Sequence, residues 1–280
     1  MVQVDNAHQT VLVVDFGAQY AQLIARRVRE ARVYSEIVPN TITAKEISER
    51  APTAIILSGG PKSVHANGAP FIDPGIYQLG IPILGICYGS QLIAQQLGGT
   101  VDRSGRGEYG RTQLSPTGQP SQLLPDEVTA GETVWMSHFD AVTKPPPGFV
   151  VSASTIDAPA AVIEDANRRI YGVQYHPEVA HTPHGQSLLK RFLEELAHCR
   201  ADWTMTNVID ESVEAIRTQV GEGRAICGLS GGVDSAVAAA LVHKAIGSQL
   251  VCVFVDTGLM RLGEGDQVIE TFQRTQGIEL

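Results

Sequence analysis

Short runs of apolar residues alternate with amphipathic stretches through the first part of the chain. Residues 11–14 are all apolar, as expected of a parallel strand covered on both faces of a sheet. Within residues 18–31, Leu23, Ile24 and Val28 recur at helical spacing. The same two patterns predict strands at residues 54–57 and 81–86, a helix opened by a Thr43–Glu46 capping box, and a helix at residues 91–97. Strands that alternate with helices predict an α/β fold with a mainly parallel, open sheet flanked by helices.

The pattern changes twice further along the chain. Residues 100–165 are rich in glycine and proline and carry short strand patterns, which predicts an antiparallel patch beside the main sheet. After a helix-like stretch at residues 186–198, a new series begins near residue 203 with a helix, a strand at 225–229, a helix from Val233 and a strand at 250–255. We therefore predict one α/β domain at residues 10–202 and the beginning of a second, doubly wound α/β domain at residues 203–280.

Composition narrows the class of protein. The 280-residue chain is 43% hydrophobic, enough for a sizeable core, and its formal net charge of -9 argues against a nucleic-acid partner. No apolar run approaches the roughly 20 residues needed to cross a bilayer, and the first residues lack the pattern of a secretory signal. The four cysteines have no CxxC spacing and fit reduced thiols better than a disulfide framework. We expect a cytoplasmic protein without a nucleic-acid or membrane partner.

The first chemical motif is Gly85-Ile86-Cys87-Tyr88-Gly89, between an apolar strand and a helix. Its glycines permit the sharp turn of a nucleophile elbow, with cysteine as the nucleophile. The N-terminus of the following helix would stabilise a thiolate at Cys87. The alternative is a buried structural cysteine, which is the commoner fate of a free cysteine.

A second motif, Gln174-Tyr175-His176-Pro177-Glu178, carries a histidine and a carboxylate two residues apart. We expect it to end a strand, which would place His176 and Glu178 on one face, and Pro177 favours an extended backbone at His176. Glu178 bonded to one imidazole nitrogen would leave the other free as the base for a thiol. Alone, the pattern is typical of a surface histidine beside a glutamate. Together with Cys87 upstream, it predicts a Cys87–His176–Glu178 triad.

Two further motifs are glycine turns. Ser58-Gly59-Gly60-Pro61 follows a predicted strand, and backbone N–H groups at Gly59, Gly60 and Tyr88 would form an oxyanion hole; a plain turn is the alternative. Leu229-Ser230-Gly231-Gly232-Val233-Asp234-Ser235 joins a strand to a helix and supplies N–H and O–H donors for an anion. It is not a Walker A loop, because no lysine lies in the turn. We favour phosphate binding over a generic glycine turn.

The motifs around Gly59-Gly60, Cys87 and His176, with Asp15-Phe16-Gly17-Ala18-Gln19-Tyr20 near the start, resemble the class I glutamine amidotransferases in order and spacing. Within that class, the opening motif and residues 22–29 resemble the GMP synthases. The resemblance implies a flavodoxin-like first domain in which Cys87 attacks the side-chain amide of glutamine, while His176, oriented by Glu178, transfers the proton. It also implies that Gln91, Ser137 and Asp140 hold glutamine. Relatives usually have Ser-His-Gly-Asp where this chain has Ser137-His138-Phe139-Asp140, and phenylalanine rarely takes the positive φ open to glycine.

The loop in the second domain is similar to the pyrophosphate loop of ATP pyrophosphatases. The resemblance implies that ATP, with Mg²⁺, is bound by Ser230, Gly231, Gly232, Val233, Asp234, Ser235 and Ala236, while Asp256 lies where relatives carry a similar acid. It further implies amination of ATP-activated XMP to GMP, with AMP and pyrophosphate released, and a homodimer formed through a C-terminal part beyond Leu280. No tightly bound metal is predicted.

Two alternatives stay open. One is a stand-alone γ-glutamyl hydrolase or an amidotransferase for another acceptor, which would not need the loop from Ser230 to Ser235. The other is a non-catalytic binding or regulatory module, against which the intact triad argues. Because only the first two strands of the second domain lie within residues 203–280, we expect the chain alone to be at most a slow glutaminase and to make no GMP.

Overall fold

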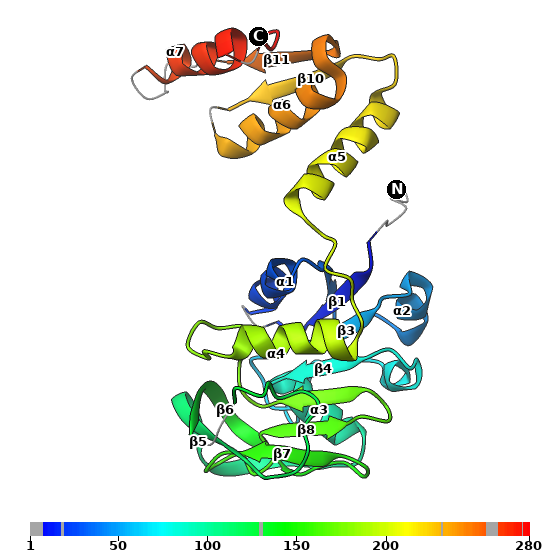
Figure 1. Cartoon of the computed structure of the whole chain (residues 1–280), viewed down its shortest axis with the longest axis vertical. Helices are drawn as coiled ribbons and strands as arrows, with labels where there is room; N and C mark the ends of the chain where they lie inside the picture. Colours follow the sequence, from blue (N-terminus) through cyan, green and yellow to red (C-terminus); the bar gives the residue numbers. More distant parts are fainter. Residues whose placement is uncertain (1–7, 18–19, 129–130, 231, 256–262, 276) are drawn as a thin grey trace. The chain divides into compact units, whose positions relative to one another are not determined.

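The computed structural model describes residues 8–17, 20–128, 131–230, 232–255, 263–275 and 277–280. The chain divides into two compact units, Met1–Trp203 and Thr204–Leu280 (Figure 1). This division falls one residue beyond the predicted boundary. The first unit has two clusters of buried apolar side chains and the second unit has one of its own, so each unit builds its own core.

The described part of the first unit is built on a nine-stranded sheet with the order β2-β1-β3-β4-β9-β8-β7-β5-β6. Strands β2, β1, β3, β4 and β9 run parallel in the flavodoxin-like order, whereas β8, β7, β5 and β6 pair antiparallel. The open, mainly parallel sheet and its antiparallel patch are thereby confirmed. The strands are β1 (Thr10–Asp15), β2 (Tyr34–Pro39), β3 (Ala54–Leu57), β4 (Ile83–Ile86), β5 (Thr100–Pro116), β6 (Glu132–Lys144), β7 (Val150–Ser154), β8 (Val162–Asp165) and β9 (Ile170–Val173).

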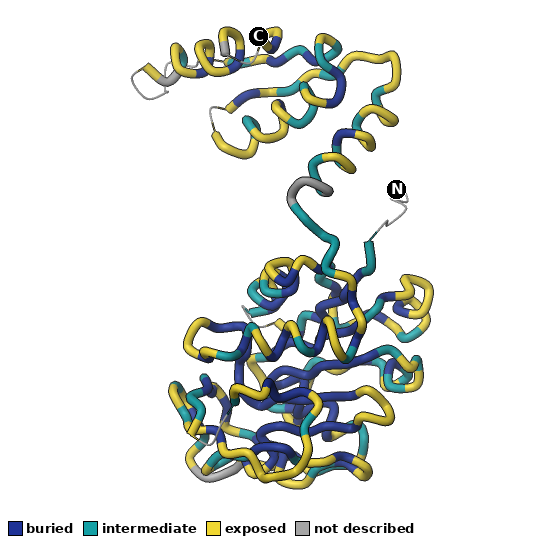
Figure 2. The backbone as a smooth tube through the Cα atoms, viewed as in Figure 1, coloured by how far each residue is buried: buried dark blue, intermediate teal, exposed yellow. Residues whose placement is uncertain are grey.

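Both faces of this sheet are covered, which explains the continuous apolar strands. Val11 and Val13 of β1 belong to one core cluster, whereas Leu12 and Val14 belong to the other. The buried strands form the centre of the unit in Figure 2, with exposed residues toward its outside. The helical segments of this unit are α1 (Ala21–Glu30), α2 (Ala44–Arg50), the 3-10 turn η1 (Pro74–Gln78), α3 (Tyr88–Gln96), α4 (Gly185–Arg191) and the π-helical turn η2 (Phe192–Leu196).

Local signals account for several element ends. The predicted capping box at α2 is confirmed: the Thr43 side chain accepts from the Glu46 N–H, and the Glu46 carboxylate accepts from the Thr43 N–H. The helix expected at residues 91–97 begins earlier, at Tyr88. The helix expected at 186–198 is α4, followed by η2 up to Leu196.

The carboxyl ends of three neighbouring parallel strands carry the sequence motifs. Gly59 and Gly60 follow β3, Cys87 follows β4, and His176 follows β9. Strands β3, β4 and β9 are adjacent in the sheet, so residues far apart in sequence meet at one edge. Open α/β sheets bind ligands at this edge.

The second unit contains α5 (Met205–Val220), β10 (Ala225–Leu229), α6 (Val233–Ile246), the 3-10 turn η3 (Gly247–Gln249), β11 (Leu250–Phe254), α7 (Glu264–Val268) and the π-helical turn η4 (Ile269–Thr275). Within the described residues of this unit, the parallel β10–β11 sheet is covered on one face only. Ile226 of β10 is 79% exposed and Val253 of β11 is 46% exposed. None of the helices in the described part of the chain has both the length and the apolar character that crossing a membrane requires.

Candidate functional site

Cys87 lies at a sharp turn between β4 and α3. Its φ of 53° and ψ of -105° are unusual for a residue with a side chain, and such strain is concentrated at functional sites. The flanking glycines are required sterically. A Cβ on Gly85 would lie 2.6 Å from the backbone of Gly89, and one on Gly89 would lie 2.3 Å from the Leu57 carbonyl oxygen. The turn therefore has the geometry of a nucleophile elbow.

His176 and Glu178 form a buried pair beside this elbow. The His176 Nδ1 and Glu178 Oε1 atoms are 2.7 Å apart, and the two residues are 3% and 0% exposed. A Cβ on Gly59 would lie 3.2 Å from His176 Cε1 and 3.9 Å from Cys87 Cβ, so the imidazole and the cysteine pack against the same glycine. The structure thus brings the three predicted triad residues together.

The expectation that a strand positions this pair is wrong. Strand β9 ends at Val173, and His176 and Glu178 lie in the turn that follows. The turn is held by hydrogen bonds instead: the His176 N–H donates to the Trp135 carbonyl at 2.9 Å, and the Thr182 hydroxyl donates to the His176 carbonyl at 2.8 Å. Arg27 fixes the other end, because its Nε donates to the Glu178 carbonyl at 2.8 Å.

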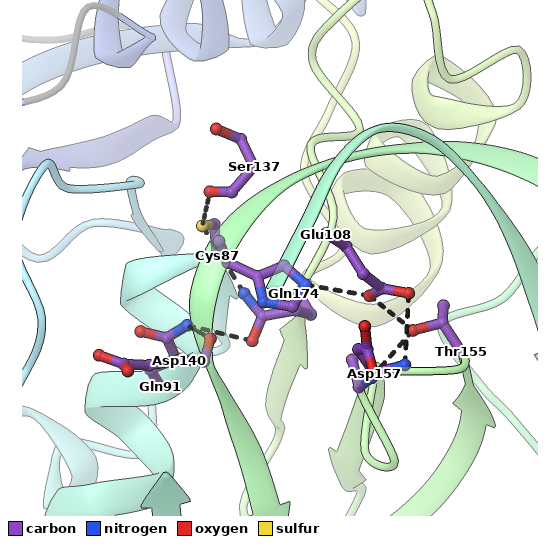
Figure 3. A network of polar contacts seen from close by, with 10 residues as sticks. Cys87, Gln91, Glu108, Ser137, Asp140, Thr155, Asp157 and Gln174 are labelled. Atoms are coloured by element: carbon purple, nitrogen blue, oxygen red, sulfur yellow. Dashed lines mark hydrogen bonds and ion pairs between the residues drawn. The ribbon is translucent and has the colours of Figure 1, made fainter. Parts of the chain in front are cut away.

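The surroundings of His176 favour its charged form. Burial by itself would lower the pKa of the imidazole, but the neighbouring Cys87 and Glu178 outweigh burial and raise that pKa to about 11. A protonated His176 is the counter-ion that a thiolate at Cys87 requires. The Gln174 side-chain amide also donates to Cys87 Sγ at 3.7 Å (Figure 3).

The predicted oxyanion-hole residues lie around Cys87. Tyr88 opens α3, where the first N–H groups have no acceptor within the helix. Gly60 packs against the Tyr88 ring so closely that a Cβ at Gly60 would lie 2.9 Å from Tyr88 Cγ. The Gly89 N–H, by contrast, already donates to the Ser58 carbonyl at 3.1 Å. The Gly89 N–H is therefore already engaged, which leaves Gly60 and Tyr88 as the candidate backbone donors.

A pocket of about 340 Å³ opens beside Cys87, and Gly60, Tyr88, Gln91, Ser137 and Asp140 are among the residues that line it. The Gln91 amide, however, donates to the Asp140 carbonyl at 2.5 Å and to Gln174 Oε1 at 3.2 Å, which holds the wall of the pocket together (Figure 3). The Ser137 carbonyl accepts from the Cys87 thiol at 3.8 Å.

Phe139, where relatives usually have glycine, does not adopt the positive φ that glycine permits. It lies within β6 rather than in a loop, and its φ is not positive. Its ring packs edge-on against Tyr109 at 5.2 Å and beneath the Arg103 guanidinium at 5.1 Å. All three residues line the pocket. Phenylalanine is therefore accommodated as part of the pocket rim.

Sequence reasoning missed several residues of this site. Gln174 is a buried polar residue within the His176 motif, and its position after an apolar strand was an available signal. Arg103, Glu108 and Tyr109 lie on β5, in a stretch interpreted only as antiparallel. His138 was noted in sequence, but nothing local connects it to Glu108, thirty residues earlier.

In the second unit, the predicted phosphate loop joins β10 to α6. Ser230 and Ser235 contact each other through their hydroxyl oxygens at 3.1 Å, and the Gly232 N–H donates to the Ser230 hydroxyl at 3.3 Å. Val233 is 77% exposed and Asp234 is also exposed, so this helix end faces outward. Ala236 offers no free N–H, because its own donates to the Gly232 carbonyl at 3.2 Å. Gly231 and Asp256 lie outside the described residues.

Two family models match the chain, one after the other along the sequence. The family model described as glutamine amidotransferase class-I matches residues 12–196, and the one described as NAD synthase matches residues 205–257. The chain is 58% identical over 99% of its length to the glutamine-hydrolyzing GMP synthase of Thermobifida fusca (strain YX), and 60% identical over 98% to that of Streptomyces coelicolor. In both cases it covers 52% of the relative, so it spans about half the length of the curated relatives it matches.

Solved structures resemble the first unit. A GMP synthase subunit from Thermoplasma acidophilum superposes with a TM-score of 0.60 at 29% identity, covering 68% of this chain and 94% of that one. A glutamine amidotransferase of Thermotoga maritima superposes with a TM-score of 0.52 at 18% identity over 68% of this chain and 98% of that one, a likeness of fold alone. With its elbow, its buried histidine–glutamate pair and a family match over residues 12–196, the chain belongs to the class-I glutamine amidotransferases.

Proposed function

We propose that the first unit hydrolyses glutamine to glutamate and ammonia. The observation that carries the proposal is a strained cysteine elbow beside a buried imidazole–carboxylate pair, at the side of a pocket of about 340 Å³. The Cys87 thiolate would attack the side-chain carbonyl carbon, and the Gly60 and Tyr88 N–H groups would stabilise the resulting oxyanion. His176 would give its proton to the departing ammonia. Water, deprotonated by His176, would then hydrolyse the γ-glutamyl thioester.

The remaining pocket residues have supporting roles in this proposal. Glu178 keeps His176 oriented and balances its charge, and Gln174 donates to the reacting sulfur. Gly59 leaves room for the imidazole next to Cys87. Gln91, Ser137 and Asp140 shape the wall that receives glutamine, with Gln91 acting through its bonds to that wall.

We further propose that a longer form of this chain, matching the full length of the curated relatives, is a GMP synthase, which uses this ammonia to aminate ATP-activated XMP and releases AMP and pyrophosphate. The names of the curated relatives and the NAD synthase match over residues 205–257 support the proposal. By the same resemblance we propose a homodimer that forms outside residues 1–280 and a cytoplasmic location. ATP and XMP are substrates of the longer protein, not of the first unit.

The loop before α6 is chemically suited to a phosphate group. It combines two serine hydroxyls with the first N–H groups of a 14-residue helix. A Cβ at Gly232 would lie 3.3 Å from the Ser230 hydroxyl, a tight contact that a small movement of that side chain would relieve. Asp234 is the described carboxylate in the first turn of α6 and would hold Mg²⁺. The ion would supply charge neutralisation for the pyrophosphate group.

Release of glutamate by the purified 280-residue chain tests the proposed hydrolysis. We expect slow release that falls by roughly 1000-fold or more in Cys87→Ala, because the nucleophile is removed. Cys199→Ala is the matched control, since Cys199 is also buried and free and should leave the rate unchanged. Equal loss in both variants, or none in Cys87→Ala, would contradict the triad. Adenylation of XMP by the longer protein tests the acceptor, and a preference for another nucleotide would indicate a different synthase.

A further inference from the structure

A buried histidine–glutamate pair lies at the pocket wall, which His138 helps to line. Nε2 of His138, on β6, is 3.1 Å from Oε2 of Glu108, on β5, and the two side chains are only 2% and 5% exposed. Two ionisable groups this deeply buried are expensive to remove from water, and such a pair is weak evidence for a purely stabilising role. The imidazole Nδ1 adds to the cost, because it has no hydrogen-bond partner among the described residues.

The Glu108–His138 pair lies beside a shift in the register of β5 and β6. Pairing of β5 with β6 matches Arg103 with Asp140 and then resumes with Glu108 opposite His138, so the register shifts between Arg103 and Glu108. A bulge of this kind removes ladder hydrogen bonds and leaves the local backbone less determined. The Glu108–His138 contact stands at the first paired position after the bulge. Gly107 fits there only without a side chain, since a Cβ would lie 2.6 Å from the His138 carbonyl oxygen.

The strand segment next to the bulge is the one that reaches Cys87. Side chains alternate along β6, so His138 is buried while Ser137 and Phe139 are exposed. The Ser137 carbonyl accepts from the Cys87 thiol at 3.8 Å, and the Asp140 carbonyl accepts from the Gln91 amide at 2.5 Å. A shift of His138 would therefore displace the backbone on both sides of it.

Glu108 is itself fixed from the opposite side. The Thr155 hydroxyl donates to Glu108 Oε2 at 2.7 Å, and the Asp157 N–H approaches Oε1 at 3.4 Å (Figure 3). Thr155 and Asp157 belong to the connection between β7 and β8. Buried polar contacts thus run from this connection through Glu108 and His138 to the wall beside the nucleophile.

We infer that Glu108 is a positioning residue for glutamine hydrolysis, which fixes the backbone of residues 137–140 against Cys87 through the buried His138. The inference rests on the proposed hydrolysis. Glu108 does not reach the reacting atoms, so its loss should change how glutamine is held rather than the reactivity of the thiolate. A misplacement of about 1 Å at a reacting centre costs on the order of 100-fold in rate, and Glu108→Gln, which retains the shape, should cost less.

The test measures glutaminase KM and kcat, alkylation of Cys87 by iodoacetamide, and the thermal midpoint. The full chain is compared with Glu108→Gln and Glu164→Gln. Glu164 is the matched control: it is a buried carboxylate of the same unit that accepts from the Gln122 N–H at 2.8 Å and the Ser152 hydroxyl at 2.6 Å. We expect Glu108→Gln to lower kcat/KM roughly 10-fold, mainly through KM, with alkylation little changed. Glu164→Gln should lower the thermal midpoint by about as much as Glu108→Gln does, but leave kcat/KM unchanged.

Thr155→Val is a second, milder variant, because it removes one bond to Glu108 without removing the charge. It should lower kcat/KM a few-fold, also through KM. The inference is overturned if Glu108→Gln keeps the kcat/KM of the unmodified chain, or loses no more of it than Glu164→Gln. Glutaminase activity absent from the unmodified chain, with Cys87 still alkylated normally, would instead refute the proposed hydrolysis itself.

Discussion

Replacing Glu178 with glutamine tests the electrostatic basis of the triad. The carboxylate is fully buried and lies 2.7 Å from His176 Nδ1. Glutamine can still accept the hydrogen bond, but it removes the negative charge that balances the imidazolium. A hydrogen bond to a charged group contributes about 1.5–3 kcal/mol, which corresponds to roughly 10- to 150-fold in an equilibrium or rate constant. We therefore expect kcat/KM for glutamine to fall within that range.

The pH profile gives a second, independent readout. In the unmodified chain, Cys87 and Glu178 outweigh burial and hold the pKa of His176 at about 11, so the imidazole stays protonated through the neutral range. In Glu178→Gln, burial is opposed by Cys87 alone, and the pKa of His176 falls toward its ordinary 6.5. The alkaline limb of kcat/KM should then move to lower pH.

The assay is glutamate release across the pH range in which both chains stay folded. Glu132→Gln is the control, because Glu132 Oε1 pairs with His184 Nδ1 at 3.0 Å at a more exposed site nearby. That variant should keep both the rate and the profile. If Glu178→Gln retains kcat/KM within about twofold and its alkaline limb does not move, the carboxylate does not support the imidazolium and the reasoning fails.

Three further outcomes are expected. Gly60→Ala should lower kcat strongly, because the new Cβ would lie 2.9 Å from Tyr88 Cγ, whereas Gly228→Ala, with nothing within 4 Å of the new Cβ, should leave glutaminase kinetics unchanged. Asp234→Ala in the longer protein should reduce ATP-dependent adenylation of XMP without unfolding the exposed turn, and unchanged adenylation would remove Asp234 from the site. Burial would raise the pKa of Glu108, but bonds from His138, Thr155 and Asp157 outweigh it and lower that pKa below 4.5. Its ionised form therefore stabilises the fold above about pH 4.5, and the stability advantage over Glu108→Gln in urea unfolding should shrink as acid protonates the carboxylate.

Much of the fold follows from the sequence because the signals are local. Continuous apolar runs predicted β1, β3 and β4, since strands covered on both faces must be apolar at nearly every position. Glycines at 85 and 89 predicted a tight turn, and the structure gives the steric reason in the approach of Leu57 to Gly89. Cys87 could be selected because an elbow needs a fixed spacing between strand, nucleophile and helix.

Tertiary structure decided the contacts between distant segments. The motif of His176 and Glu178 was expected on a strand, yet bonds from Trp135 and Thr182 hold it in a turn beyond β9. The meeting of Glu108 with His138 depends on the register of two strands after a bulge, and no local pattern encodes a register shift. Burial of a carboxylate or an imidazole is likewise invisible in sequence, because it depends on what the rest of the chain packs around it. The sequence determined which groups can do chemistry, and the packing determined which of them meet.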